Sequence, residues 1–271
     1  TWGPGLLRGF AFVDCEWPNK KKNRRFQLHH LPLTLLPMAL PFFYKEDVST
    51  NTLVLDEDTS KHVTGVLRMK VGEQLLLTDG RGTKATAEIT DDHRKRCTVS
   101  IVQTEKEGRK KGGVTIAISL VKNVARFEWF LEKATEMGVA EIIPLLCQRT
   151  EKEKFRQERL QQIITSAMLQ SQQVWMPTLH EPTPFEKAVA QAAQNHKFIA
   201  HCGPQQKSSL QQFAVKEAES AIMLIGPEGD FTEKEIEAAL QAGFAPVALG
   251  STRLRTETAG MVAAALLCIR G

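Results

Sequence analysis

From residue 114 onward, short apolar runs alternate with stretches of helical periodicity, and this alternation constrains the fold more than any other feature. The apolar runs have the length of single strands and lack the polar alternation of a half-exposed sheet. They cover residues 114–121, 140–146, 197–202, 221–225 and 246–249. The helical patterns cover residues 127–137, 153–174, 232–242 and 256–269. Gly138 is a natural residue to end the first of these helices. Buried strands separated by helices predict an α/β domain with a mostly parallel sheet.

The preceding part of the chain, from residue 40 to residue 103, has a different rhythm. Residues 84–90 and 97–101 alternate between apolar and polar side chains, and Asp79-Gly80 marks a turn. One helical pattern, over residues 58–69, interrupts these short segments. Several short strands with a single helix predict a small β-barrel or sandwich.

The stretch TEKEGRKKGG, residues 104–113, is charged and rich in glycine, as inter-domain linkers are. We therefore expect a first domain over residues 38–106, a linker over 107–113 and a second domain over 114–271. Residues 1–37 lack periodicity and precede Met38, so we interpret them as an unstructured or non-native extension. A disordered basic tail is the alternative interpretation.

Charge and cysteine content limit the partners and the compartment. The formal net charge is +4, and the whole excess lies in residues 1–37, so a nucleic-acid partner for the remaining chain must be argued from local patches. The five cysteines include no CxxC pair and the histidines show no metal spacing. We therefore expect no metal, no disulfide framework and a cytoplasmic location. The sequence contains no 18-residue apolar stretch, so we expect no membrane span.

A glycine-rich loop, LIGPEGDF, connects the apolar run 221–225 to the next helix. We expect Gly226 and Gly229 to permit backbone conformations closed to other residues and to let a ligand come close. Thr232 and Glu235 have the spacing of a capping box, so a plain turn leading into a capped helix is the alternative. The loop is neither a P-loop nor a GxGxxG motif. In open parallel sheets, loops after the carboxyl ends of strands are where ligands bind.

A second junction, LGSTRLRTETAG, occupies residues 249–260 and also leads from a strand into a helix. Thr256 or Thr258 can cap that helix, and a glutamate at position 257 suits its positive end. Capping does not explain Arg253 and Arg255, because cations near a helix N-terminus are unfavourable. They need an anion: a carboxylate such as Glu257 or Glu228, a phosphate, or charge that develops in a reaction. A structural arginine–glutamate pair is the alternative.

Four sequence blocks together resemble one family. They are LIGPEGDFTEKEI, LGSTRLRTETAG, the upstream EKATEMGVAEIIPL, and VLRMKVGE in the first domain. In this order and spacing they resemble the bacterial 16S rRNA uridine-N3 methyltransferase family of the SPOUT superfamily, over residues 38–271. The resemblance implies a PUA-like barrel followed by a trefoil-knotted α/β domain, whose last strand and helix thread through a loop. It also implies an S-adenosylmethionine-dependent homodimer that acts on 16S rRNA or the assembled small ribosomal subunit.

The resemblance further implies a cofactor pocket formed by the two junctions. The residues that it assigns to this pocket are Ile225, Gly226, Glu228, Gly229, Leu249, Gly250, Leu254, Arg255 and Thr256. Many members of the family have a glycine where this chain has Asp230. A carboxylate there fits a helix cap, but the departure puts close backbone approach in doubt.

Methylation of uridine N3 requires that the nucleophile lose its proton. We expect Arg255 to stabilise the uracil anion, with Glu228 or Glu257 orienting this arginine or relaying the proton. The RNA-binding candidates are Arg68, Arg149, Gln170 and Arg253, and Lys152, Lys154, Arg156 and Arg159 are candidates for phosphate contacts. A solvated helix face is the alternative for the last four.

Two questions stay open at the sequence level. The small residues of the last helix, among them Gly260 and Ala263, fit either a dimer contact or burial within one subunit. The function also has alternatives. The protein could be a SPOUT methyltransferase for another RNA or for ribose 2′-O, or a non-catalytic RNA-binding ribosome assembly factor.

Overall fold

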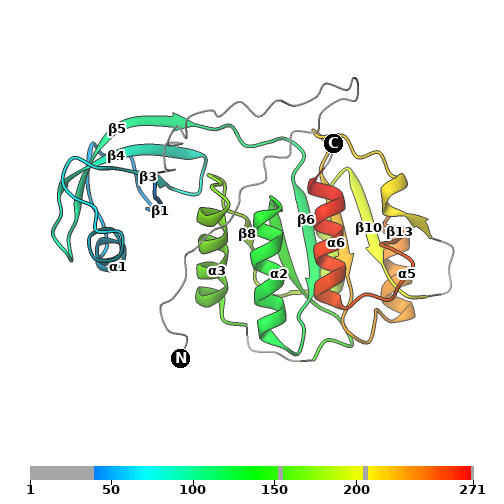
Figure 1. Ribbon diagram of the computed structural model, residues 1–271. Helices are drawn as coiled ribbons and strands as arrows, with labels where there is room; N and C mark the ends of the chain where they lie inside the picture. Colours follow the sequence, from blue (N-terminus) through cyan, green and yellow to red (C-terminus); the bar gives the residue numbers. More distant parts are fainter. Residues whose placement is uncertain (1–39, 152–154, 204–206, 270–271) are drawn as a thin grey trace, which may run out of the picture. The chain divides into compact units, whose positions relative to one another are not determined.

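The computed structural model describes residues 40–151, 155–203 and 207–269 (Figure 1). The predicted extension 1–37 and the phosphate candidates Lys152 and Lys154 therefore lie outside the described residues. None of the described helices is long and apolar enough to cross a membrane.

The larger sheet lies in the second half of the chain, as the apolar runs predict. Its strands are β6 (Val114–Ser119), β7 (Glu141–Leu146), β8 (Thr178–Leu179), β9 (Thr183–Pro184), β10 (His196–Ala200), β11 (Ser208–Ser209), β12 (Ala221–Ile225) and β13 (Ala245–Ala248). The order is β11-β13-β10-β12-β6-β7-β8, with β9 paired to β7, and every pairing is parallel. β13, the last strand along the described chain, therefore lies between two strands that precede it in the sequence.

Helices cover both faces of this sheet. Successive strand residues point to opposite sides, and apolar residues on both sides need a covering layer. The helices are α2 (Val124–Glu136), α3 (Gln157–Gln170), α4 (Phe185–Gln191), α5 (Glu233–Gln241) and α6 (Thr256–Cys268), with a short turn η2 (Leu210–Gln212). Ile116 and Ile118 of β6 pack in one core with α2, α3 and α6, whereas Ala117 packs in a second core with α4 and α5. The result is a three-layer α/β domain.

Small residues of α6 are packed inside the subunit. Gly260 lies so close to Ile118 and Phe130 that a Cβ atom would come within 2.7 Å of each. Ala263 and Ala264 are fully buried in the same core. For these three residues, burial within one subunit is the correct interpretation of the small-residue pattern.

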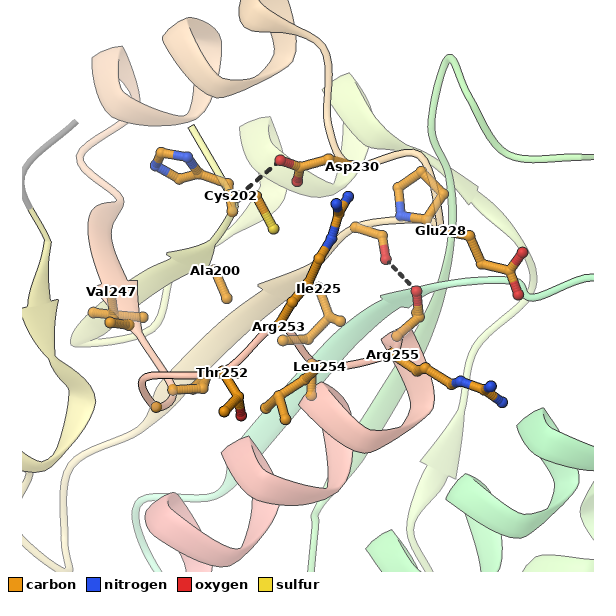
Figure 2. Close-up of a pocket in the computed structure, with 18 of the residues that line it drawn as sticks. Ala200, Cys202, Ile225, Glu228, Asp230, Val247, Thr252, Arg253, Leu254 and Arg255 are labelled. Atoms are coloured by element: carbon orange, nitrogen blue, oxygen red, sulfur yellow. Dashed lines mark hydrogen bonds between the residues drawn. The ribbon is translucent and has the colours of Figure 1, made fainter. Parts of the chain in front are cut away.

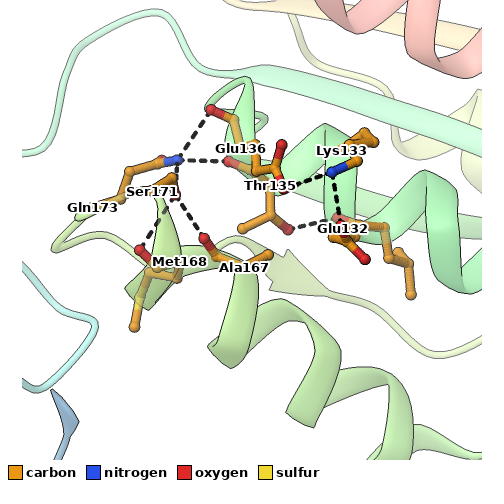
Figure 3. A network of polar contacts seen from close by, with 9 residues as sticks. Glu132, Lys133, Thr135, Glu136, Ala167, Met168, Ser171 and Gln173 are labelled. Carbon is orange, nitrogen blue, oxygen red and sulfur yellow. Dashed lines mark hydrogen bonds and ion pairs between the residues drawn. The ribbon is translucent and has the colours of Figure 1, made fainter. Parts of the chain in front are cut away.

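The ends of α2 and α3 are tied together at the amino-terminal edge of the sheet (Figure 3). Gly138 has φ +84° and ends α2 as predicted. The Gln173 amide donates to the Thr135 carbonyl at 2.7 Å and to Ser171 Oγ at 2.8 Å. The predicted helix 153–174 is shorter in the structure, where α3 spans Gln157–Gln170. It ends at Ser171 because the chain there enters this hydrogen-bonded turn.

The first part of the chain forms a five-stranded sheet of order β1-β3-β4-β5-β2. Its strands are β1 (Phe42–Tyr44), β2 (Thr52–Val54), β3 (Gln74–Thr78), β4 (Thr83–Asp91) and β5 (Thr98–Lys106). Only the β1–β3 pair is parallel, and two register shifts between β4 and β5 promote the twist that curls the sheet into a half-barrel. The predicted inward positions Ala85, Ala87 and Ile89 are fully buried.

The predicted helix 58–69 is split in the structure. α1 (Glu57–Lys61) continues as a π-helical turn, η1 (His62–Val66), and helical geometry is lost at Arg68, which has φ +58°. The segment after α3 hydrogen-bonds to the β3–β4 turn: Gly82 N–H donates to Val174 O at 2.8 Å, and Met176 N–H donates to Gly80 O at 2.9 Å.

Candidate active site

A pocket of about 690 Å³ opens at the carboxyl ends of β10, β12 and β13 (Figure 2). Three connections line it. Residues 200–202 and Lys207 lie at or after the end of β10, residues 225–228 and Asp230 at or after the end of β12, and residues 247–256 at or after the end of β13. Arg126 of α2 and Ala259 of α6 complete the lining. The position is the one where open parallel sheets bind ligands. The volume suits a small-molecule cofactor.

The structure brings most of the predicted cofactor residues together. The lining includes Ile225, Gly226, Glu228, Leu249, Gly250, Leu254, Arg255 and Thr256. Gly229 is not part of the lining. Its carbonyl oxygen instead accepts a 2.6 Å hydrogen bond from Arg149 Nη1, so this glycine joins the loop to the end of β7.

The glycines of the loop after β12 are not explained by the unusual backbone conformation that the sequence led us to expect. Neither Gly226 nor Gly229 has a positive φ, so the expectation of a special backbone conformation is wrong. A Cβ atom on Gly226 would lie 3.1 Å from the Phe231 ring, and this crowding explains the glycine. Gly250 differs, because a Cβ atom there would meet nothing within 4 Å. Its missing side chain leaves open space in the pocket wall.

Asp230 joins two of the pocket loops. It has φ +64°, a conformation that favours glycine, and its Oδ2 accepts a 2.8 Å hydrogen bond from the Cys202 backbone N–H. The expectation that it caps the next helix is wrong, because Thr232 and Glu235 form the predicted capping box of α5. The carboxylate therefore offsets a strained backbone by tying the loop after β12 to the loop after β10.

The start of α6 also differs from the prediction. Arg255 occupies the N-cap position without a side-chain cap, so neither Thr256 nor Thr258 caps the helix. Thr256 lies one residue inside the helix, where its hydroxyl cannot fold back onto the following amides. Its Oγ1 instead donates a buried 2.9 Å hydrogen bond to the Gly226 carbonyl, which joins the two predicted junctions directly (Figure 2).

The carboxylates expected to orient Arg255 belong to another arginine. Arg126, in the first turn of α2, lies with Nη1 4.0 Å from Glu228 Oε1 and Nε 3.6 Å from Glu257 Oε1. Among the described residues, no carboxylate lies within ion-pair distance of Arg255, which is exposed. The expectation that Glu228 or Glu257 orients Arg255 is therefore wrong. Arg126 is not among the residues singled out from the sequence. An arginine in the first turn of a helix, where a cation is unfavourable, is the signal that could have identified it.

The two arginines of the second junction point in different directions. Figure 2 shows the Arg253 side chain running across the pocket toward Asp230, whereas the Arg255 side chain extends away from the pocket. Both are exposed. Arg253, expected to contact RNA, thus lines the pocket and is exposed to solvent.

The loop after β10 adds polar groups that the sequence did not single out. His201 is buried and lines the pocket, and its Nδ1 accepts a 3.1 Å hydrogen bond from the Gly203 N–H. Burial, together with the nearby Lys207, lowers the pKa of the His201 imidazole. This lowering of the pKa favours the neutral form of the ring. Within the described residues, no group of His, Cys, Asp or Glu side chains could hold a metal ion.

The other RNA candidates lie outside the pocket lining. Arg68 is exposed and holds a left-handed conformation after the π-helical turn, a kind of strain that clusters at functional sites. Gln170 is exposed at the end of α3, beside the carboxyl end of α2, whereas Arg126 marks the amino end that faces the pocket. Arg159 forms a two-pronged ion pair with Glu128 of α2, a partner outside its own helix.

Comparison with known proteins decides the family. A family model described as an RNA methyltransferase domain matches residues 109–268, more than half of the chain. The chain belongs to this RNA methyltransferase family. A second model, described as an RNA methyltransferase PUA domain, matches residues 55–102. The predicted fold class, a SPOUT-type α/β domain preceded by a small PUA-like β-barrel, is confirmed, and the barrel is a curled half-barrel in the structure.

Individual relatives in the family span most of the chain. A ribosomal RNA small subunit methyltransferase E from Synechocystis is 30% identical over 81% of this chain and 74% of its own. The crystal structure of a probable rRNA-methyltransferase from Porphyromonas gingivalis is 38% identical, with a TM-score of 0.78 over 83% of this chain and 95% of that one. A ribosomal RNA small subunit methyltransferase E from Neisseria gonorrhoeae, bound to S-adenosyl methionine, is 28% identical, with a TM-score of 0.74 over 83% and 95% of the two chains.

Proposed function

We propose that this protein is an S-adenosylmethionine-dependent methyltransferase that methylates N3 of a uridine in the 16S rRNA of the small ribosomal subunit. The observation that carries the proposal is the pocket at the carboxyl ends of β10, β12 and β13, lined by eight of the nine residues assigned from the sequence. The relative from Neisseria gonorrhoeae, which has the same fold, was solved with S-adenosyl methionine bound.

The pocket residues fit this cofactor in shape and chemistry. Apolar side chains of Ala200, Ile225, Val247, Leu249 and Leu254 provide surface for a flat aromatic base. The open space at Gly250 lets a ligand approach the backbone, whose N–H and C=O groups can read adenine edges. When bound, the cofactor supplies an electrophilic methyl group on a sulfonium.

The chain's own residues must bring uridine N3 into line with that methyl group and remove its proton. We assign the proton removal to Glu228, because it lines the pocket and its side chain is 55% exposed, so it can act as a proton acceptor. Arg255 also lines the pocket and has no ion-pair partner among the described residues, so its side chain, which extends away from the pocket in Figure 2, is free to turn toward the uracil oxygens on which negative charge develops. Glu257 is buried and takes no direct part in this scheme.

RNA binding in this proposal uses two surfaces. Arg253 and Arg149 hold the target strand near the pocket, since both are exposed beside the loop that follows β12. Arg68 contacts RNA from the half-barrel, and Gln170 does so from the end of α3. Phosphate contacts of this kind make RNA affinity fall steeply with salt concentration, whereas cofactor affinity changes little.

We further propose that the enzyme works as a cytoplasmic homodimer. Trp129 of α2 and Ile269 after α6 are large apolar residues left 40% and 70% exposed. We take these exposed apolar side chains, one on α2 and one directly after α6, as part of a surface that a second copy buries. Sedimentation of the purified protein, at concentrations above and below a micromolar, measures this directly.

Mass spectrometry of rRNA from a strain that lacks the gene tests the proposed activity. The expected result is the loss of one N3-methyluridine from 16S rRNA, restored by the wild-type gene. Loss of a 2′-O-methylated nucleotide, or of a methyl group from another RNA, would refute the assigned target. An unchanged methylation profile together with no S-adenosylmethionine binding in calorimetry would instead support an assembly factor.

A further inference from the structure

Arg126 lies where three elements of the pocket meet. It belongs to the first turn of α2 and lines the pocket, and its guanidinium faces Glu228 from the loop after β12 and Glu257 from the first turn of α6. Among the described residues, Arg126 is the cation found within 4.0 Å of either carboxylate. One side chain therefore connects the helix that follows β6 with both pocket junctions.

The position of Arg126 is unfavourable unless its partners are present. The amino end of a helix carries partial positive charge, so a cation in the first turn of α2 is repelled. Two carboxylates within 4.0 Å offset this repulsion. The arrangement thus depends on the pairing of Arg126 with both glutamates and is not a consequence of helix propensity.

The two carboxylates differ in exposure, and this difference assigns different roles to them. The Glu257 side chain is 8% exposed, and its Oε2 has no hydrogen-bond partner among the described residues. A buried carboxylate of this kind needs the neighbouring cation. The Glu228 side chain is 55% exposed at the pocket rim. Glu257 therefore anchors Arg126 near Nε, while Nη1 lies 4.0 Å from Glu228, the carboxylate that can meet a substrate.

We propose that Arg126 is a positioning residue for methyl transfer: held by Glu257, it orients Glu228 to accept the proton of uridine N3. This inference rests on the function proposed above. In the step, the N3–H bond breaks and the proton passes to the Glu228 carboxylate. The electron pair left on N3 forms the bond to the methyl carbon, and the electrons of the carbon–sulfur bond that breaks stay on sulfur.

A purely structural role is the competing explanation, because Arg126 also neutralises a buried charge. The first experiment therefore compares Arg126→Met and Arg126→Lys with Lys133→Met, in the full-length protein. Lys133 is a matched control, because it is a cation of the same helix that also lies near two glutamates. It is at the opposite end of α2, away from the pocket. Single-turnover and steady-state methylation, calorimetry with S-adenosylmethionine and thermal melting are measured for each.

For Arg126→Met we expect kcat to fall about 10- to 100-fold, a part of the roughly 10²- to 10⁴-fold that a positioned general base contributes, while cofactor Kd and RNA KM change less than about threefold. Arg126→Lys should recover part of kcat, because a cation at the same place still attracts Glu228. Lys133→Met should keep wild-type kcat. A loss confined to KM or Kd, or a kcat unchanged in Arg126→Met, would overturn the proposal.

Double variants separate the two carboxylates. If Arg126 acts through Glu228, adding Arg126→Met to Glu228→Gln lowers kcat no further, because the oriented group is already gone. Arg126→Met with Glu257→Gln removes the buried charge, so this variant should regain melting temperature while kcat stays low. Recovery of kcat together with melting temperature would show that Arg126 only neutralises Glu257.

The outcomes also distinguish failure of this inference from failure of the proposed function. If the wild-type protein does not methylate 16S rRNA but binds S-adenosylmethionine, the proposed function fails before any variant is compared. If the wild type methylates N3 and the double-mutant cycle shows that Arg126→Met and Glu228→Gln lower kcat independently, only the positioning role is refuted.

Discussion

Thr256→Val is a nearly isosteric change that removes one hydrogen bond from the wall of the pocket. The hydroxyl of Thr256 donates to the Gly226 carbonyl at 2.9 Å, and Thr256 is only 5% exposed. A buried carbonyl left without this partner costs about 1–3 kcal/mol, whereas threonine and valine have similar helix propensities. We therefore expect the free energy of unfolding to fall by about 2 kcal/mol. In a domain of this size, the melting temperature should then fall by about 4–8 °C.

The same bond holds the two pocket junctions together, so ligand affinity should fall as well. Without it, the first turn of α6 and the loop after β12 lose their fixed spacing, and binding must restore that order. We expect the Kd for S-adenosylmethionine to rise roughly tenfold, which corresponds to about 1.4 kcal/mol. Calorimetry measures this at a temperature well below the melting transition.

Two variants serve as controls for Thr256→Val. Thr256→Ser keeps the hydroxyl and should stay close to the wild type in both measurements. Thr258→Val changes a threonine of the same helical turn that, among the described residues, makes no hydrogen bond to the loop after β12, and it should be nearly silent. The reasoning is refuted if Thr256→Val melts and binds as the wild type does, or if Thr256→Ser is equally damaging.

Three further changes test other parts of the structure. Gly250→Val places a side chain in open pocket space, so it should leave the unfolding free energy nearly unchanged but weaken S-adenosylmethionine binding at least about tenfold in calorimetry; normal binding would contradict the cofactor assignment. Gly260→Ala should lower stability by about 1 kcal/mol in urea denaturation, because the clash with Phe130 outweighs the gain in helix propensity; a stabilised variant would contradict it. Burial raises the pKa of the Cys147 thiol from 9.0 to about 12, so the folded state binds the proton more tightly than the unfolded state. Stability should fall by up to about 1.4 kcal/mol per pH unit as the pH rises from 9 to 12, and Cys147→Ala should remove that part of the slope.

The strand and helix pattern of the second domain could be predicted from the sequence because burial there follows periodicity. The run AIMLI coincides with β12, and all five of its residues are buried. The short strands β8, β9 and β11 were not predicted, since two residues carry no periodic signal. α4 was also missed, although Phe185, Ala188 and Val189 bury one face, because its seven residues make barely two turns.

At the site, the sequence located the loops but not the pairing of their side chains. Rules of local sequence identified the Thr232–Glu235 capping box, whose partners lie three residues apart. They could not assign Glu228 and Glu257 to Arg126, because an ion pair between distant segments depends on where the sheet places three loops. Gly226 shows the same limit: its reason is the ring of Phe231, a packing constraint that only the folded chain reveals.

The place of β13 in the sheet bears on when this protein becomes active during its own synthesis. β13 lies between β11 and β10, and the pocket takes much of its wall from residues 247–256. Until these residues have left the ribosomal tunnel, one edge of β10 has no neighbour and the cofactor pocket lacks a side. A nascent chain without these residues therefore lacks one wall of the pocket proposed to bind the methyl donor, and the open edge of β10 is a site of misassembly until β13 pairs with it. An enzyme proposed to modify ribosomes would thus gain its cofactor only after residues 247–256 have joined the sheet.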